Sequence, residues 1–556
     1  MTTWPIAGTL VRVQERKRIP SWLLPTLFCL LALVGFVGLD RHFTAVTDGG
    51  REAGRAALAV GSQIASVALP GVGEDEPPDP SIVDEAAAVV EATFRPDTDV
   101  WVDPASSQRP WSDLGAVEGL LTFRGNPTRT YYGQGPVPAE PVVAWTYDIG
   151  CSVSPVGGEA KTWCGSGWTG QPAVYPSAVT GEWQVAFGAY NRAVNFLDPI
   201  TGEEVLPKYF TDDIVKGSVT VDPDGFPLLY TGSRDNHFHV VALDREEPVA
   251  LWKLSSDAVS PTLWNNDWDS SSLVIDDHLI IGGENGRFFV VELRRGFDAD
   301  GLVTVDPVIA YSTESWDAEL LTALGDLQVS VENSVAVSGD VAWFTNSGGL
   351  VQGWDIGDLA EGGEPFQVFR YWTGDDTDAS LVIDEEGMIY LGSEYERGTA
   401  RSQELGQIMK LDPSRPDDPV VWSREANEGL GSGIWATPAL WGNLLIVATN
   451  GGELLGLDRE TGEERWTLEL PGPLWSSPVV VDDVLIQTDC EGGINAFDLS
   501  GGGRPTELWS IQVGGCLEST PAVWDGWIYV GSRDGRFYAV SDCEAIPGRP
   551  CGVDAN

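Results

Sequence analysis

The carboxy-terminal half of the chain repeats one pattern of apolar and polar positions. An apolar run is followed by a two-residue turn, a second apolar run, a glycine-rich turn and an alternating strand. Tight turns between β-rich segments are typical of hairpins, so each unit predicts three consecutive antiparallel strands. The clearest copies are WATPALWGNLLIVATNGGELLGLDRETGEERW from Trp435, WSSPVVVDDVLIQTDCEGGINAFDL from Trp475 and ESTPAVWDGWIYVGSRDGRFYAV from Glu518.

Each unit continues into a fourth predicted strand that carries a large aromatic residue, such as Trp466 in RWTLEL or Trp509 in LWSIQV. A spacing of about forty to sixty residues between units fits four-stranded propeller blades with loop insertions. The sequence therefore predicts an all-β protein, an eight-bladed β-propeller of four-stranded antiparallel blades. The eight blades are expected to start near Ala173, Gly217, Ser270, Ser330, Ala379, Trp435, Ser476 and Ser519.

The last unit lacks a fourth strand of its own. After Val540 the chain turns to SDCEAIPGRPCG, whereas Val142–Tyr147, upstream of the first unit, reads VVAWTY. We expect this upstream segment to complete the eighth blade, with Trp145 as its outer tryptophan. A ring closed in this way leaves no exposed strand edge.

The repeat resembles the pyrroloquinoline quinone (PQQ) repeat. The S-x-P-V-V start, the G-S-x-D-G-x-x-Y-A turn and the D-x-x-T-G-E-x-x-W end of that repeat match Ser476–Pro478, Gly531–Gly535 and Asp458–Trp466. Leu120–Thr130 (LLTFRGNPTRT) resembles the F-R-G-N-x-x-R lead-in of bacterial propellers of this type. The resemblance covers residues 116–542. It implies the PQQ-like fold, but the family includes quinoprotein dehydrogenases and outer-membrane assembly lipoproteins, so it does not fix the function.

An uncharged apolar segment lies close to the amino terminus. Ser21–Leu39 reads SWLLPTLFCLLALVGFVGL, long enough to cross a bilayer, and a basic stretch ending in Arg16, Lys17 and Arg18 precedes it. Positive charge favours the cytoplasmic side, so we expect an uncleaved transmembrane signal anchor over 21–39 with residues 1–20 in the cytoplasm. A cleaved signal peptide is the alternative.

The segment after the anchor differs from the repeats in composition. Gly73–Pro80 reads GEDEPPDP, and its acidic and proline residues oppose both helix and core. We therefore expect residues 40–115 to form an acidic, Pro- and Ala-rich flexible stalk, 116–542 the propeller and 543–556 a C-terminal tail. This order predicts a single-pass protein of the cell membrane with its propeller on the extracytoplasmic side.

The net charge and the cysteines limit which partners and which cell compartment we expect for this protein. The formal net charge is −50, from 83 acidic and 33 basic residues, which disfavours nucleic acid and anionic lipid as partners. Such a charge is explained by its contribution to solubility. Binding of cations or basic partners is the alternative explanation. Six of the seven cysteines lie outside the apolar segment, and an even number suits disulfides in an oxidising compartment. We predict the pairs Cys151–Cys164, Cys490–Cys516 and Cys543–Cys551.

No catalytic constellation stands out. Quinoprotein dehydrogenases resembling this fold use a vicinal Cys-Cys pair, an acidic base and a calcium held by Glu, Asn and Asp. No two cysteines are adjacent here. We therefore expect no catalytic residue and no cofactor, with a PQQ- and calcium-dependent oxidoreductase as the alternative. His237 and His239 alternate on one predicted strand, but two ligands make no closed metal site, and we expect them to line blade two.

The insertions gather on one face of the predicted propeller, which we call the decorated face. It collects the loops between second and third strands and the loops between blades, here Val259–Ser270, Ser312–Gln328, Thr373–Ala379 and Ser393–Gln407. Long loops often carry function. We expect a scaffold that binds a protein or a cell-surface polymer through this face.

The candidate binding residues on the decorated face are tryptophans mixed with acids. Buried aromatic residues dominate interface energies, and acids tune the rate and salt dependence of association. In the competing interpretation, Trp264 and Trp268 cover the centre of the ring and stabilise the fold. The candidates are Trp264, Asp267, Trp268, Asp269, Trp316, Asp375, Asp376, Asp378 and Trp435.

Overall fold

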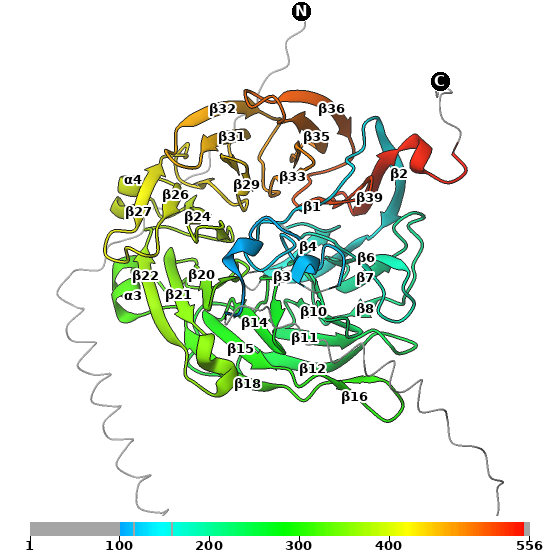
Figure 1. The fold of residues 1–556 in the computed structure, drawn as a ribbon, viewed down its shortest axis with the longest axis horizontal. Helices are drawn as coiled ribbons and strands as arrows, with labels where there is room; N and C mark the ends of the chain where they lie inside the picture. The colour runs from blue at the N-terminus through cyan, green and yellow to red at the C-terminus, as the bar shows by residue number, and fades with distance from the viewer. Residues whose placement is uncertain (1–99, 115–116, 157–158, 169, 550–556) are drawn as a thin grey trace, which may run out of the picture. The chain divides into compact units, whose positions relative to one another are not determined.

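Eight antiparallel sheets are arranged radially around a common centre in the computed structural model (Figure 1). The structure describes residues 100–114, 117–156, 159–168 and 170–549. Within this part of the chain the predicted all-β, eight-bladed propeller is confirmed. The expected anchor over 21–39 and most of the expected stalk lie outside the described residues. No helix among the described residues is long and apolar enough to span a bilayer.

The first four blades are complete four-stranded sheets, each running outward from its first strand. Blade one contains β5 (Ala173–Pro176), β6 (Trp183–Ala189), β7 (Ala193–Leu197) and β8 (Tyr209–Phe210). Blade two contains β9 (Thr220–Val221), β10 (Leu228–Gly232), β11 (His237–Ala242) and β12 (Val249–Ser255). Blade three contains β13 (Leu273–Ile275), β14 (His278–Gly283), β15 (Arg287–Glu292) and β18 (Val308–Glu314). Blade four contains β19 (Ala336–Ser338), β20 (Val341–Phe344), β21 (Leu350–Asp355) and β22 (Phe366–Trp372).

Blades five to seven follow the same order. Blade five contains β23 (Val382–Ile383), β24 (Ile389–Gly392), β26 (Ile408–Leu411) and β27 (Val420–Arg424). Blade six contains β29 (Ala439–Trp441), β30 (Leu444–Ala448), β31 (Glu453–Asp458) and β32 (Glu464–Glu469). Blade seven contains β33 (Val479–Val481), β34 (Val484–Thr488), β35 (Gly493–Asp498) and β36 (Thr506–Gln512).

The eighth blade joins the two ends of the propeller. It contains β37 (Ala522–Trp524), β38 (Trp527–Gly531), β39 (Arg536–Asp542) and, as its outer strand, β2 (Pro141–Asp148). Trp145 lies opposite Ala539 in this pairing, which confirms the predicted closure. The short β1 (Gly133–Gln134) adds a fifth strand, parallel to β37.

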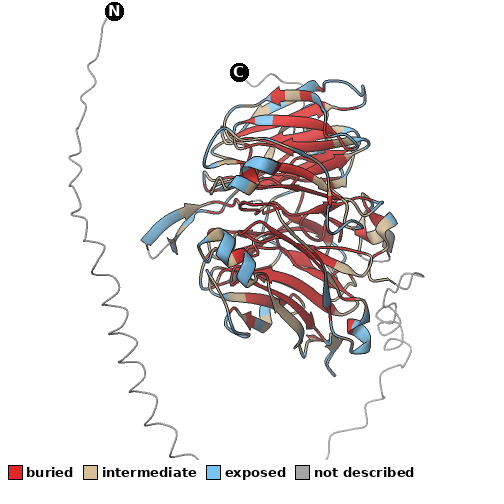
Figure 2. Cartoon of the chain, turned by 90° about the vertical axis from the view of Figure 1, so that its left-hand side faces the viewer, coloured by how far each residue is buried: buried red, intermediate tan, exposed pale blue. Residues whose placement is uncertain are grey.

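Short elements decorate the loops. Three small sheets of two strands each lie in these loops. They pair β3 (Cys151–Val156) with β4 (Glu159–Cys164), β16 (Gly296–Phe297) with β17 (Val303–Thr304), and β25 (Glu394–Tyr395) with β28 (Ser432–Gly433). Among the described residues, the helices are α3 (Ala318–Leu324), α4 (Ala400–Leu405) and the 3-10 turns Pro104–Ser106, Trp111–Leu114, Gly357–Glu361 and Cys543–Ala545. Figure 2 shows that buried residues follow the blade strands, whereas many loops are exposed.

Several outer-strand tryptophans donate a hydrogen bond to a backbone carbonyl beyond their own sheet. The indole N–H of Trp422 in blade five donates to the carbonyl of Arg459 in blade six at 3.0 Å. A Cβ on Gly462 would lie 2.6 Å from the Trp422 ring, and this glycine has φ +71°, so only glycine suits the turn that receives the indole. Trp145 docks on the turn containing Gly202 in the same way. The many tryptophans of the sequence therefore have a repeated structural role.

The lead-in Leu120–Thr130 lies at the centre of the ring and joins distant blades. Arg129, fully buried, donates to the carbonyls of Val335 in the approach to blade four and Ser271 in the approach to blade three, both at 2.9 Å. Arg124, equally buried, donates to the carbonyls of Pro478 and Pro438 on the far side of the ring. Burial lowers the pKa of Arg129 to about 9 and that of Arg124 to about 10.

Residues 100–114, assigned from the sequence to the end of the stalk, contact the propeller. Val102 pairs with Gly339, and the backbone N–H of Trp101 donates to Oδ1 of Asp340 at 3.0 Å. The part of the chain that packs on the blades therefore begins before residue 116.

Candidate functional site

The loops that lead into the inner strands share one sequence pattern. A variable residue is followed by a mostly small residue and then by serine or threonine, as in Asp378-Ala379-Ser380. The pattern occurs in seven of the eight loops. The variable residues are Lys216, Asp269, Glu332, Asp378, Trp435, Trp475 and Glu518 for blades two to eight.

The hydroxyl residues of this pattern join neighbouring blades. The backbone N–H of Ser334 donates to Oγ of Ser380 at 2.8 Å, and that of Ser380 donates to Oγ1 of Thr437 at 3.0 Å. This belt fixes each loop relative to the next, so the variable residue two positions earlier is also held in place. Equivalent bonds join Gln171 to Ser218, Ser271 to Ser334, Thr437 to Ser477 and Ser477 to Thr520.

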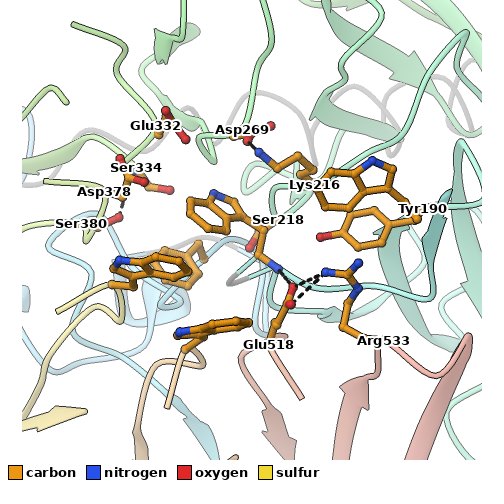
Figure 3. A pocket seen from close by; sticks show the side chains of 15 residues that line it. Tyr190, Lys216, Ser218, Asp269, Glu332, Ser334, Asp378, Ser380, Glu518 and Arg533 are labelled. Atoms are coloured by element: carbon orange, nitrogen blue, oxygen red, sulfur yellow. Dashed lines mark hydrogen bonds and ion pairs between the residues drawn. The ribbon is translucent and has the colours of Figure 1, made fainter. Parts of the chain in front are cut away.

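All seven variable residues line one cavity of about 220 Å³ (Figure 3). Phe123 of the lead-in also lines it, as do Trp163, Trp168 and Tyr190 from the region around blade one. The cavity therefore lies on the decorated face at the centre of the ring, where loops from every side meet.

One side of the cavity is aromatic. Trp435 and Trp475 stack with ring centroids 5.0 Å apart, and Trp168 lies 5.6 Å from Trp435. Among the described residues, the buried Nε1 atoms of Trp435 and Trp475 have no hydrogen-bond acceptor. These atoms are donors left available to a ligand, since an unmet buried donor costs free energy.

Another side is acidic, formed by Asp269, Glu332 and Asp378 from blades three to five (Figure 3). Asp269 forms an ion pair with Lys216. Burial raises the pKa of Glu332. The positive charge of Lys216 lowers this pKa, and the negative charge of Asp269 raises it further. Burial and the charge of Glu332 raise the pKa of Asp378 well above its usual value.

The two cationic side chains of the lining already have partners. Arg533 donates to both carboxylate oxygens of Glu518, at 2.8 and 3.0 Å, and its guanidinium lies 5.0 Å from the ring centre of Tyr190. The ammonium of Lys216 lies 4.9 Å from the ring centre of Trp168. The lining therefore holds four carboxylates and two paired cations.

The structure brings some of the sequence candidates to this cavity. Asp269, Asp378 and Trp435 line it directly. Asp376 belongs to the same loop as Asp378, and Asp375 is buried with its carboxylate accepting from the backbone N–H groups of Arg397 and Gly398.

The other candidates lie elsewhere. Trp268 is 0% exposed and packs against Phe238 and Phe289, whereas Trp264 is 55% exposed. Trp316 is half-buried in a small apolar cluster between α3 and blade four, and Asp267 forms an ion pair with Arg234. The set is thus spread over the decorated face rather than gathered at one point.

Sequence reasoning missed most of the cavity lining. Lys216, Glu332, Trp475, Glu518 and Arg533 were not among the candidates, because none stands out in its own loop. Aligning the seven loops that share the serine or threonine would have found four of them.

Two predicted disulfides are confirmed. Cys151–Cys164 closes the β3–β4 hairpin, and Cys490–Cys516 joins the turn after β34 to the loop that leads into blade eight. Cys551, the predicted partner of Cys543, lies outside the described residues.

The two histidines belong to the structure of blade two. His239 is fully buried, with Nδ1 2.7 Å from the Tyr209 hydroxyl and Nε2 3.1 Å from Oδ1 of Asp235. Nδ1 of His237 lies 2.8 Å from the carbonyl of Asp235. Both rings therefore serve local hydrogen bonds, as expected.

Comparisons with known proteins place these features in context. The family model described as outer membrane protein assembly factor BamB matches residues 404–541. The outer membrane protein assembly factor BamB of Alteromonas naphthalenivorans is 29% identical over 96 residues, 15% of this chain and 22% of that protein. The match therefore spans less than a quarter of that relative.

Two solved structures share the architecture. Quinohemoprotein alcohol dehydrogenase from Comamonas testosteroni has a TM-score of 0.52 at 13% identity, over 82% of this chain and 84% of that one. A europium-containing methanol dehydrogenase has a TM-score of 0.52 at 12% identity, over 76% of this chain and 98% of that one. At such low identity these similarities show the fold alone.

Proposed function

We propose that this chain, a PQQ-like β-propeller, is a scaffold that binds a protein partner on its decorated face and holds a basic side chain of that partner in the central cavity. The observation that carries the proposal is the division of the cavity lining into an acidic side, containing Glu332, and an aromatic side, containing Trp435 and Trp475.

The two sides suit the two ends of a lysine or arginine side chain. The cationic head would meet Glu332, while the apolar stem would lie along the indole rings of Trp435 and Trp475. The free Nε1 donors of both indoles suit the carbonyl oxygens of a peptide backbone. A peptide segment supplies cation, apolar stem and acceptors together, which supports a protein as the partner.

The comparisons are consistent with this class of partner. The relative from Alteromonas naphthalenivorans is named as an outer membrane protein assembly factor, a role that concerns other proteins. A cell-surface polymer with basic groups would use the same chemistry, and it remains the alternative ligand.

The residues of the cavity do not fit PQQ, the group that similarity to quinone-dependent dehydrogenases implies. PQQ is flat, and the stacked Trp435 and Trp475 offer it a face. It also carries three carboxylates, whereas Lys216 and Arg533 are already paired and Glu332 and Asp378 are acids. An anion would therefore be repelled. We propose no cofactor and no oxidoreductase step for this chain.

The binding test uses the full-length chain in detergent micelles. Short fluorescent peptides that contain lysine and tryptophan are titrated in low and high salt, beside peptides in which glutamate replaces lysine. We expect the lysine peptides alone to bind, with an affinity that falls as salt rises. Glu332→Gln is expected to weaken this binding about tenfold or more, because it removes one charged partner.

The matched control is Glu182→Gln. Glu182 is exposed in the turn between β5 and β6, on the opposite face, and its replacement is expected to change nothing. Equal binding of lysine and glutamate peptides would contradict the proposal. If the chain oxidised alcohols or sugars in a dye-linked assay after incubation with PQQ and calcium, the oxidoreductase function would replace the scaffold function proposed here.

We further propose that Ser21–Leu39 anchors the propeller on the extracytoplasmic side of the cell membrane. The apolar length and the basic residues before it support this orientation. Protease added to spheroplasts is expected to digest the propeller and spare a fragment containing residues 1–39. A propeller that resists the protease until the membrane is lysed would reverse the orientation.

A further inference from the structure

Blades three and five carry the same pair of acids at equivalent positions. Asp269 and Asp378 each stand two residues before the hydroxyl residue of their loops. Glu284 and Glu394 each follow the second strand of their blade, in IGGE and LGSE. The propeller thus offers an internal comparison between two acidic pairs in the same setting.

The pair in blade three receives a cation from the chain itself. Lys216, at the equivalent position of blade two, forms an ion pair with Asp269, and its charge also acts on Glu284. An ammonium group brought in from the preceding blade therefore offsets part of the charge of the blade-three acids, although Oδ1 of Asp269 and Oε1 of Glu284 have no hydrogen-bond partner among the described residues.

The acidic pair in blade five receives a negative charge, not a positive one, from the preceding blade. The preceding blade carries Glu332 where blade two carries Lys216, and a third acid, Asp376, lies in the same loop. One carboxylate oxygen from each of Asp376, Asp378 and Glu394 lies within 4.8 Å of the others.

Asp376 and Glu394 are buried, Asp378 is partly buried, and the cluster is incompletely paired. Glu394 is 3% exposed and Asp376 is 8% exposed. Oδ1 of Asp376 and Oδ1 of Asp378 are buried and, among the described residues, have no hydrogen-bond partner. The site therefore combines a cluster of three carboxylates with carboxylate oxygens that have no hydrogen-bond partner. Both features indicate that a positive charge is missing there.

The neighbouring arginine does not supply that charge in full. Nη1 of Arg397 is 3.7 Å from Oδ2 of Asp376. The same guanidinium donates to the carbonyl of Ser347 at 2.6 Å and to Asp326 at 3.1 Å. Among the described residues, no ion pair joins Arg397 to Asp378 or Glu394. The charge of Glu394 raises the pKa of Asp378, and the two carboxyl groups also share a hydrogen bond.

We propose that Asp376, Asp378 and Glu394 bind one divalent, oxygen-preferring cation of the calcium class. Such cations take carboxylate oxygens at about 2.3–2.6 Å, so oxygens a few ångströms apart can share one ion. The ion replaces, in blade five, the ammonium that Lys216 supplies in blade three.

The bound cation has a local structural consequence. It joins the loop that leads into blade five to β25, which begins at Glu394 and pairs with β28 near Trp435. It also satisfies Asp378, so that Glu332 remains the unpaired acid of the cavity. The site shares Asp378 with the lining of the cavity. Calcium binding is measured without a peptide, so its test does not rest on the proposed partner.

The test is a calorimetric titration of the chelator-treated, full-length chain with CaCl₂. We expect one site per chain and a rise in melting temperature with calcium, since a ligand that binds only the folded state stabilises it. Asp378→Asn and Glu394→Gln are each expected to weaken binding about a hundredfold or to abolish it, because each removes a charged ligand.

The matched controls are Asp269→Asn and Glu284→Gln, the equivalent changes in blade three. They are expected to keep one site with an affinity close to that of the original chain. Absence of a calcium-dependent rise in melting temperature would overturn the proposal. Many weak sites that Glu394→Gln leaves unchanged would also overturn it, because they would assign the binding to the acidic surface as a whole.

Discussion

Trp435 and Trp475 stack with ring centroids 5.0 Å apart and ring planes inclined by 23°, although they come from different blades. Each stands two residues before a hydroxyl of the belt, Thr437 or Ser477, and the backbone N–H of Thr437 donates to Oγ of Ser477 at 3.0 Å. The belt therefore sets the distance between the two indoles, which together form the flat side of the cavity.

Replacing Trp475 by alanine is expected to weaken binding of the lysine peptides about tenfold or more, since a desolvated cation–π contact and its apolar area are lost together. Trp475→Phe is expected to retain more of the affinity. Fluorescence anisotropy measures both. The control is Trp441→Ala on the opposite face, where the indole donates to Asp483. Unchanged affinity in Trp475→Ala would remove the aromatic side from the site.

Trp268 and Trp264 are expected to respond differently to alanine. Trp268 is buried among Phe238 and Phe289, so Trp268→Ala should lower the free energy of unfolding by about 3–5 kcal/mol. Trp264 is 55% exposed, so Trp264→Ala should leave stability almost unchanged and reduce partner capture instead. Denaturant unfolding and pull-down with the full-length chain separate the two effects. A large loss of stability in Trp264→Ala would assign both residues to the fold.

Arg129→Met is expected to lower the free energy of unfolding by about 3–5 kcal/mol, because it leaves buried carbonyl oxygens without a donor and disconnects blades three and four from the lead-in. The shift of the denaturation midpoint measures the effect. Arg465→Met is the control. The Arg465 side chain is exposed, and its partner Asp458 keeps hydrogen bonds from Asn443 and Thr461, so this change should have little effect. Equal midpoints for the two variants would mean that the lead-in does not hold the ring.

Glu284→Gln is expected to stabilise the protein more at about pH 8 than at about pH 5. Burial, with the charges of Asp269 and Glu332, raises the pKa of Glu284 well above its usual value. A group whose pKa is raised on folding stabilises the fold below its unfolded pKa, and this contribution is lost as the pH rises through the raised value. The neutral amide avoids that loss.

Melting temperatures are measured in the presence of a chelator from about pH 5 to about pH 8. They test whether the stabilisation by Glu284→Gln increases with pH. The exposed Glu182→Gln serves as the control and should leave the pH profile unchanged. A difference between Glu284→Gln and the original chain that is the same at both pH values would show that the Glu284 carboxyl does not carry the predicted shift.

Removing the second disulfide, by Cys490→Ser with Cys516→Ser, is expected to lower the free energy of unfolding by about 2–4 kcal/mol, since the bond restrains the unfolded chain. Non-reducing peptide mapping should recover both described pairs and, in addition, the predicted Cys543–Cys551. Recovery of Cys543 with a different cysteine would refute that third pair.

The local pattern of the sequence was sufficient to predict the ring. Alternating apolar runs and turns such as Asp482-Asp483 specify hairpins, because strand and turn preferences act within a few residues. The need to avoid an open edge then predicted that Trp145 completes the last blade. The pairing of Cys490 with Cys516 followed from the same topology, since both positions fall on one face once the blades are placed.

The site was decided by the tertiary structure. Lys216, Glu332, Trp475 and Glu518 are separated by whole blades in the sequence, and each is unremarkable in its own loop. Closure of the ring and the hydroxyl belt bring them to one cavity, where burial raises the pKa of Glu332. Whether an acid meets a lysine, as Asp269 does, or another acid, as Asp378 does, depends on which residue the neighbouring blade contributes. Residue types along the chain specify the blades through short-range interactions, whereas the charge balance of the cavity arises only from contacts between residues far apart in sequence.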